Sequence, residues 1–410
     1  MAEKKILSNG LRIVTEKIPT VKSVAIGVWI STGVVTEDSQ NNGISHFIEH
    51  MLFKGTENRS AREIAEAVDS VGGHINAFTG RESTCYYLKV LDENLDLAVD
   101  LLSDMMFRSL FDEEEIEKEK SVIAEEISMY EDSPEDLAHD LLIENMYKNH
   151  SLGYSILGHN HTIENMNRRN LMEYMSSQYR PDNTVLAVAG NFDDHHLDEL
   201  IQQYFGNWKP NDHQAAVPME TPTLRFAQIS RQKDIEQIHL NIGYQGASLG
   251  SDEMYDLLVI NNIVGGSMSS RLFQTIREDR GLVYSIYSSM HNYTKSGVFT
   301  LYCSMNPGQL SLVRELIDEE LYQLVHHGFT REEFEKARSQ LKGSYLLGME
   351  STSGRMASMG KSELLLERIE TPDDILLKIN QLDQSNAEKV MRQYLNPDRK
   401  TVVQVGRIGY

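Results

Sequence analysis

The segment Gln178-Tyr-Arg-Pro-Asp-Asn-Thr-Val-Leu-Ala-Val-Ala-Gly190 occurs a second time, in altered form, as Gln393-Tyr-Leu-Asn-Pro-Asp-Arg-Lys-Thr-Val-Val-Gln-Val-Gly406. Each copy follows a helical pattern and runs from a Pro-Asp turn into an apolar strand. The two copies stand 215 residues apart in a chain of 410. This spacing is far longer than a solenoid repeat and indicates that a whole domain has been duplicated.

Both halves also share a pattern upstream of this segment. A strand-like run, Val24 to Ile30 in the first half and Ile238 to Tyr244 in the second, precedes an apolar helix in each. Further strand-like runs follow at Ile75 to Val90 and at Leu282 to Cys303. Because runs of strands adjoin runs of helices without strict alternation, we predict an α+β fold. It has two homologous domains, each a largely antiparallel sheet with helices packed on it.

A polar stretch with several prolines separates the two halves. Such composition is typical of a connection between domains. We therefore predict a first domain at 1–212, a linker at 213–226 and a homologous second domain at 227–410.

Composition excludes several classes of protein. The net charge of -22 argues against a nucleic-acid partner. No apolar run reaches the roughly 18 residues that cross a bilayer, and the first residues do not resemble a signal peptide. The two cysteines, Cys85 and Cys303, are too few for a disulfide framework. We expect a cytoplasmic protein with neither a nucleic-acid nor a membrane partner.

The motif His46-Phe-Ile-Glu49-His50 carries the candidate chemistry. It lies in an expected helix with a Ser or Asn cap, where residues 46 and 50 are one turn apart on the same side. Two imidazoles in that relation can share one metal ion, and Glu49 is close enough to take a proton from a water molecule on that ion. The order H-x-x-E-H is the inverzincin arrangement.

A catalytic zinc ion needs a third protein ligand. The acidic helix expected at 112–130 has an apolar stripe that includes Ile123 and Ile127, and Glu119 and Glu126 share its inward face. Carboxylates on a core face are unfavourable unless they are paired or bind a metal. The pattern therefore selects Glu119 or Glu126 as the ligand and does not decide between them.

These residues resemble the pitrilysin/insulinase family of zinc peptidases, and most of all the single-chain bacterial relatives of the mitochondrial processing peptidase β subunit. The segment 43–56 matches the metal motif of that family, and the resemblance extends over essentially the whole chain. It implies that Glu126 is the third ligand, and that Glu119 supports catalysis without binding the metal.

The resemblance also implies residues that contact substrate. The segment 72–87 is similar to the family's strand that binds a peptide by β-addition, with Asn76 and Ala77 at the contact positions. From the residues alone, Arg277 is a surface charge and Tyr284 begins a strand; the resemblance makes both of them contacts near the scissile bond. The helix of the second half near Asp256–Val264 lacks H-x-x-E-H, so we expect one Zn²⁺ per chain.

These expectations combine into one function. We expect a zinc-dependent endopeptidase that hydrolyses peptides or unfolded segments, with a preference for basic ones, and that uses Glu49 to activate a water molecule. The family builds a closed chamber from four domains, which implies a homodimer in which Arg277 and Tyr284 act on the partner's zinc site. A catalytically inactive structural or partner subunit is the alternative. A zinc hydrolase of some non-peptide bond also stays open.

Overall fold

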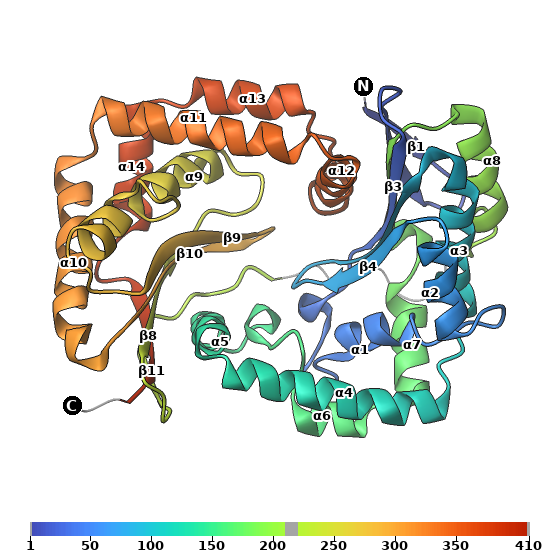
Figure 1. The fold of residues 1–410 in the computed structure, drawn as a ribbon, viewed down its shortest axis with the longest axis horizontal. Helices are drawn as coiled ribbons and strands as arrows, with labels where there is room; N and C mark the ends of the chain where they lie inside the picture. Colours follow the sequence, from blue (N-terminus) through green and yellow to red (C-terminus); the bar gives the residue numbers. More distant parts are fainter. Residues whose placement is uncertain (1, 210–219, 408–410) are drawn as a thin grey trace. The chain divides into compact units, whose positions relative to one another are not determined.

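The computed structural model describes residues 2–209 and 220–407, which form two compact units (Figure 1). Each unit is a β-sheet with helices packed on it. The first unit takes its described residues from Met1–Ile127, Tyr154–Pro218 and Leu347–Pro372, and the second takes them from Ser128–Gly153, Met219–Leu346 and Asp373–Tyr410.

The sheet of the first unit has six strands in the order β1-β2-β6-β3-β5-β4. Neighbouring strands are antiparallel, except that β2 and β6 are parallel. Within the described residues β4 pairs with β5 alone, so β4 forms one edge of the sheet. The strands are β1 (Ala2–Ile6), β2 (Arg12–Lys17), β3 (Ser23–Ile30), β4 (His74–Thr79), β5 (Thr84–Leu91) and β6 (Thr184–Gly190).

Alternation along the central strand β3 explains how helices cover both faces of this sheet. Val24 and Ile26 enter a large core shared with most helices of the unit, whereas Ala25 and Trp29 pack against α12 on the other face. The helices of the unit are α1 (Ile44–Met51), α2 (Ala61–Asp69), α3 (Leu95–Arg108), most of α4 (Glu113–Asp132), α6 (Asn160–Asn165), α7 (Arg168–Gln178), α8 (Asp194–Phe205) and α12 (Thr352–Leu366).

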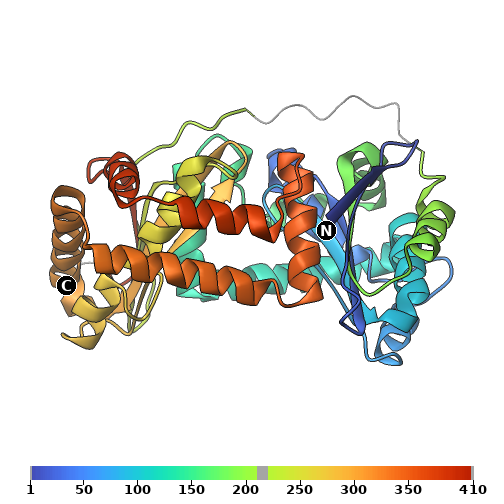
Figure 2. The same cartoon turned by 90° about the horizontal axis from the view of Figure 1, so that it is seen from above.

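The sheet of the second unit has the order β7-β11-β8-β10-β9, and only β7 and β11 are parallel. Helices α11 and α13 lie side by side in this unit (Figure 2). The strands are β7 (Gln228–Gln232), β8 (Ile238–Gln245), β9 (Ser285–Tyr293), β10 (Ser296–Met305) and β11 (Lys400–Gly406). The helices are α5 (Pro134–Met146), α9 (Asp252–Val264), α10 (Leu310–His327), α11 (Arg331–Gly348), α13 (Pro372–Gln381) and α14 (Gln384–Tyr394).

The predicted duplication is visible in the two sheets. The run β2-β6-β3-β5-β4 of the first sheet matches β7-β11-β8-β10-β9 of the second in order and direction. The repeated segment of the sequence ends in β6 and in β11, each after a helix, α7 or α14. The α+β prediction is confirmed. The runs 75–90 and 282–303 each contain two antiparallel strands, β4 with β5 and β9 with β10.

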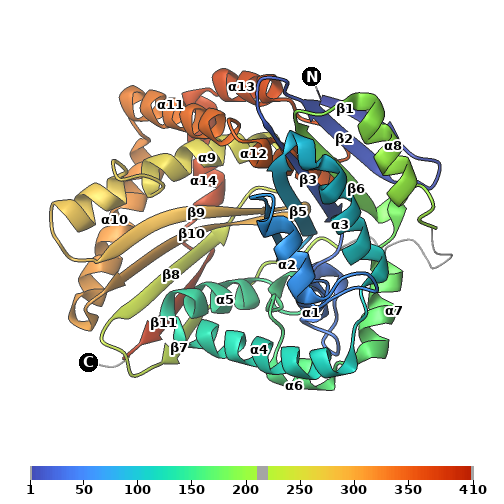
Figure 3. The ribbon, with the colours of Figure 1, turned by 45° about the vertical axis from the view of Figure 1, so that its right-hand side comes forward.

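The compact units depart from the contiguous domains expected at 1–212 and 227–410, because each half of the chain contributes one helix to the other unit. Helix α5 packs on β8 and β11, and α12 packs on β2, β3 and β6 (Figure 3). A glycine makes room in each case. A Cβ at Gly243 would lie 2.6 Å from Met146 Sδ, and one at Gly27 would lie 2.5 Å from Met356 Sδ.

Of the predicted linker 213–226, residues 213–219 lie outside the described residues. Residues 220–226 are described and belong to no helix or strand. Among the helices that the structure describes, none combines the length and the hydropathy needed to cross a membrane.

Candidate metal centre

Helix α1 is eight residues long, begins after Gly43 and contains the H-x-x-E-H motif. Gly43 has φ +94°, and a Cβ there would lie 2.8 Å from Gly158 Cα, so glycine is required on both counts. The expected Ser or Asn cap is therefore wrong. Instead the Glu37 carboxylate, from outside the helix, accepts hydrogen bonds from the backbone N–H groups of Gly43 and Ser45.

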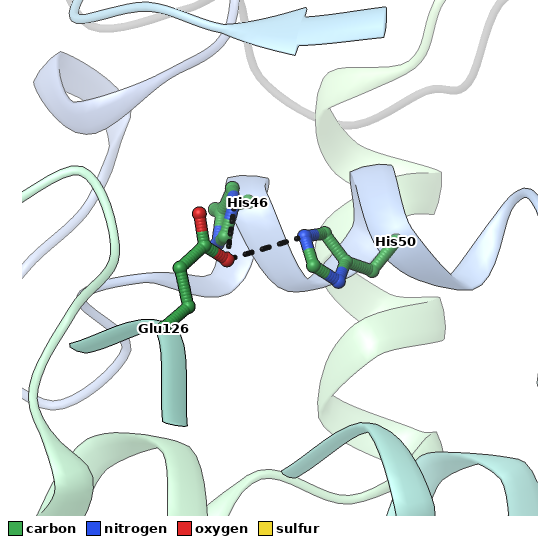
Figure 4. Close-up of side chains that lie close together, drawn as sticks. All are labelled: His46, His50 and Glu126. Atoms are coloured by element: carbon green, nitrogen blue, oxygen red, sulfur yellow. Dashed lines mark ion pairs between the residues drawn. The ribbon is translucent and has the colours of Figure 1, made fainter. Parts of the chain in front are cut away.

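Helix α4 brings Glu126 to the two histidines of α1. Glu126 Oε2 lies 3.7 Å from His46 Nε2 and 3.7 Å from His50 Nε2 (Figure 4). The two imidazole rings are 4.5 Å apart between centroids. His46, His50 and Glu126 are the one group of three ligand-type residues that converges within the described part of the chain, with ligand atoms within 4.8 Å of one another.

This arrangement fits a zinc ion. Nitrogen and oxygen ligands at zinc-bond distance from a tetrahedral ion lie roughly 3.4 Å from each other, close to the separations found here. Burial, with a smaller contribution from His50, lowers the pKa of His46 to about 3. The imidazole is therefore neutral at neutral pH and offers a lone pair, as a metal ligand must.

Glu119 lies on the other side of His50, two helical turns before Glu126 on α4. Its Oε1 is 2.7 Å from His50 Nδ1, and its Oε2 is 2.6 Å from Lys54 Nζ. Burial acts to raise the pKa of Glu119, but hydrogen bonds from His50 and Lys54 outweigh it and leave the pKa below its ordinary value. The carboxylate thus holds the proton of His50 on Nδ1 and leaves Nε2 facing Glu126.

Glu49 is anchored to the edge strand β4. The Thr79 hydroxyl donates a hydrogen bond of 2.5 Å to Glu49 Oε2. Burial raises the pKa of Glu49, while the bond from Thr79 and the neighbouring His50 act in the opposite direction. On the same strand Asn76 is exposed and Ala77 is half-buried. The general-base candidate and the candidate peptide-binding strand are therefore joined directly.

Arg277 and Tyr284 belong to the second unit, whereas the residues of the metal centre all belong to the first. Arg277 is exposed in a short π-helix, Phe273–Glu278, with its guanidinium 4.7 Å from the centre of the Phe273 ring. Tyr284 stands just before β9 and is 75% exposed. Single-turn π-helices are rare and are often found at functional sites.

Sequence reasoning missed three residues around the centre: Lys54 contacts Glu119, Thr79 contacts Glu49, and Glu37 contacts the start of α1. Lys54 had a detectable signal, because it follows His50 by four residues in the same motif. Thr79 is separated by 30 residues from Glu49, and Glu37 has no capping-box spacing to α1. Those two contacts depend on the tertiary fold.

Comparisons with known proteins identify the family. The model described as Insulinase (Peptidase family M16) matches residues 12–160, and the model described as Peptidase M16 inactive domain matches residues 165–341. The uncharacterized zinc protease YmxG of Bacillus subtilis is 47% identical over 398 residues, 97% of either protein. The chain belongs to peptidase family M16.

Two further similarities extend this result. An uncharacterized zinc protease of Streptomyces coelicolor is 38% identical over 396 residues, which cover 95% of this chain and 86% of the relative. The crystal structure of a protease from Helicobacter pylori matches with a TM-score of 0.93 at 23% identity, covering 99% of both chains. The first supports a zinc protease and the second supports the fold. Zinc is therefore the cofactor of this M16 chain.

Proposed function

We propose that the chain is a zinc-dependent endopeptidase that hydrolyses peptides or unfolded segments, with Glu49 as the general base. The observation that carries this proposal is the convergence of His46, His50 and Glu126 beside Glu49. Inactive subunits of such a family lose one or more of these residues, whereas the whole set is present here together with Glu119. That set favours activity over the alternative of an inactive structural or partner subunit.

His46, His50 and Glu126 would hold the ion in the proposed reaction. When bound, zinc supplies Lewis-acid chemistry that polarises the scissile carbonyl and lowers the pKa of a water molecule. Glu49 accepts the proton of the attacking water and then delivers it to the leaving amine. The Thr79 hydroxyl keeps Glu49 Oε2 in place during both transfers, and Glu119 keeps the proton of His50 on Nδ1.

The edge strand β4, which pairs with β5 alone among the described residues, supports a peptide substrate. A peptide that adds to this edge makes main-chain hydrogen bonds, which read no side chains and suit a broad specificity. The strand carries Asn76 and Ala77, and Thr79 ties it to Glu49. A peptide along β4 would therefore pass beside the general base. The net charge of -22 favours basic peptides through its overall field.

The first experiment measures zinc content by atomic absorption together with cleavage of a mixed library of quenched peptides. We expect one zinc per chain and cleavage that a chelator abolishes and added zinc restores. Zinc without cleavage of any peptide would favour the inactive subunit. A chain without zinc would mean that His46 and His50 are only core residues.

We also propose a homodimer with a closed chamber in a cytoplasmic setting, in which Arg277 and Tyr284 steady the substrate in the partner's zinc site. Both side chains are exposed, as a role in contacting a ligand requires. A guanidinium and a phenol can stabilise the oxyanion of a tetrahedral intermediate.

Mixing two impaired variants tests whether Arg277 and Tyr284 act on the zinc site of the partner chain. Glu49→Gln and Tyr284→Phe chains are each expected to be weak alone, and mixed dimers should regain one intact site. The measurement is peptide cleavage after the two chains are unfolded and refolded together, with each chain treated alone as the control. Activity no higher than the sum of the parents would contradict action in trans.

A further inference from the structure

Glu37 is a buried carboxylate that the proposed reaction does not use. Its side chain is 6% exposed and stands before the metal-binding helix α1. Oε2 accepts hydrogen bonds from the backbone N–H of Gly43 at 2.8 Å and from Asn42 Nδ2 at 2.9 Å. Oε1 accepts one from the backbone N–H of Ser45 at 3.0 Å. Burial raises the pKa of Glu37, and these hydrogen bonds from the start of α1 act in the opposite direction and offset part of the cost of burying the carboxylate.

Helix α1 has no side-chain cap of its own, although its apolar residues are packed in the core. The first N–H groups of a helix lack acceptors within the helix, and Gly43 has no side chain to cap them. An isolated helix shorter than about 12–15 residues is marginal in water, and α1 has eight. A carboxylate at this end also interacts favourably with the helix dipole. Glu37 supplies acceptors for two of these N–H groups, those of Gly43 and Ser45, and places a carboxylate at this end of the helix.

The two histidines differ in how they are oriented. Glu119 accepts a hydrogen bond from His50 Nδ1, the usual outer-shell contact of a metal-binding histidine. His46 Nδ1 is buried and has no hydrogen-bond partner among the residues that the structure describes. The placement of His46 therefore depends on packing and on its backbone, and not on a hydrogen bond to Nδ1. Ser45, the residue directly before it, donates its N–H to Glu37.

We propose that Glu37 is a positioning residue of the metal centre, a clamp that fixes the start of α1 and thereby the placement of His46 and Glu49. Glu37 positions His46 by holding the backbone of the preceding residue, whereas Glu119 positions His50 by a hydrogen bond to its ring. The inference rests on the proposed function, because it takes His46 as a ligand and Glu49 as the base.

The test is the zinc affinity of Glu37→Gln, measured in the full chain by competition with a fluorescent chelator. The side chain of Glu37 is surrounded by N–H donors from Asn42, Gly43 and Ser45. Glutamine replaces one of its two acceptor oxygens with an NH₂ donor, so at least one of these hydrogen bonds is lost. Outer-shell changes weaken metal binding by about 10–100-fold, and we expect a loss in that range. At saturating zinc we also expect a lower kcat with an unchanged KM, because Glu49 is displaced while the β4 edge is not. If Glu37 had only a structural role, its replacement would lower the melting temperature of the zinc-free protein but would not lower kcat at an unchanged KM.

Matched variants make the result specific. Glu57→Gln changes an exposed carboxylate in the loop after α1, and it should bind zinc as the wild type does. Tyr174→Phe removes the hydroxyl 2.9 Å from Ser45 Oγ but leaves the hydrogen bonds that Glu37 accepts from the Gly43 N–H, the Ser45 N–H and Asn42 Nδ2. It should also bind zinc as the wild type does. Glu37→Asp keeps the charge on a shorter arm and should lose less affinity than Glu37→Gln.

Each other outcome overturns the proposal. Wild-type zinc affinity in Glu37→Gln, or in Glu37→Asp if only that variant folds, would show that the clamp does not position the ligands. An equal loss in Tyr174→Phe would show that any disturbance of this buried network has the same effect. A wild-type chain without zinc would overturn the proposed function and this inference together, whereas the first two outcomes leave the proposed function intact.

Discussion

Glu49→Gln is expected to lower kcat for peptide cleavage by about 10²–10⁴-fold, the usual contribution of a general base. Glutamine has nearly the same shape and can still accept the hydrogen bond from Thr79, but it cannot take a proton. None of the three metal ligands is altered, so zinc content should stay at the wild-type level. Steady-state kinetics on a quenched peptide, together with atomic absorption, measures both quantities.

The matched control for this variant is Glu57→Gln, which removes an exposed carboxylate from the same region of the chain. It should cleave at the wild-type rate. Binding of the peptide by Glu49→Gln should also be retained, because the β4 edge is untouched. If Glu49→Gln turned over peptide as fast as the wild type, the base would have to be another group.

Much of the fold could be predicted from the sequence because its main signals are local. The repeat that ends in Gly190 and Gly406, the apolar strands β3 and β8, and the Pro-Asp turns all depend on short-range patterns. Two copies of one pattern imply two similar sheets, and the structure has them.

The exchange of α5 and α12 between units could not be predicted in this way. An amphipathic helix shows which of its faces is buried, but not which sheet buries it. The deciding contacts join residues about 100 and 330 positions apart, such as Met146 with Gly243 and Met356 with Gly27. Only the folded chain shows that these small and large side chains are complementary.

The candidate site, like the fold, could be predicted only where its residues are close in sequence. His46, Glu49 and His50 share one short helix, so their spacing alone predicts their proximity. Helical spacing placed both Glu119 and Glu126 on the inward face of α4 but could not rank them. In the structure Glu126 lies between the two Nε2 atoms, whereas Glu119 contacts Nδ1 of His50.

Glu126→Gln is expected to have the largest effect on zinc binding among the carboxylates of α4. It removes a negatively charged ligand atom that lies 3.7 Å from both histidine Nε2 atoms. The loss of affinity should exceed the roughly 10–100-fold that is typical of an outer-shell change. Peptide cleavage should fall with it at zinc concentrations that saturate the wild type. Chelator competition and steady-state kinetics test the two effects separately.

Two other glutamates of α4, Glu119 and Glu125, provide the controls, because they have the same side chain as Glu126 but point in other directions or contact other groups. Glu125 is exposed and points about 100° away from Glu126, so Glu125→Gln should bind zinc as the wild type does. Glu119→Gln removes the acceptor of His50 Nδ1 and should fall between the two. Zinc affinity is therefore expected to be highest in Glu125→Gln, lower in Glu119→Gln and lowest in Glu126→Gln. A larger loss in Glu119→Gln than in Glu126→Gln would reverse the assignment of ligand and supporting carboxylate, since a side chain that only orients His50 cannot contribute more than one that binds the ion.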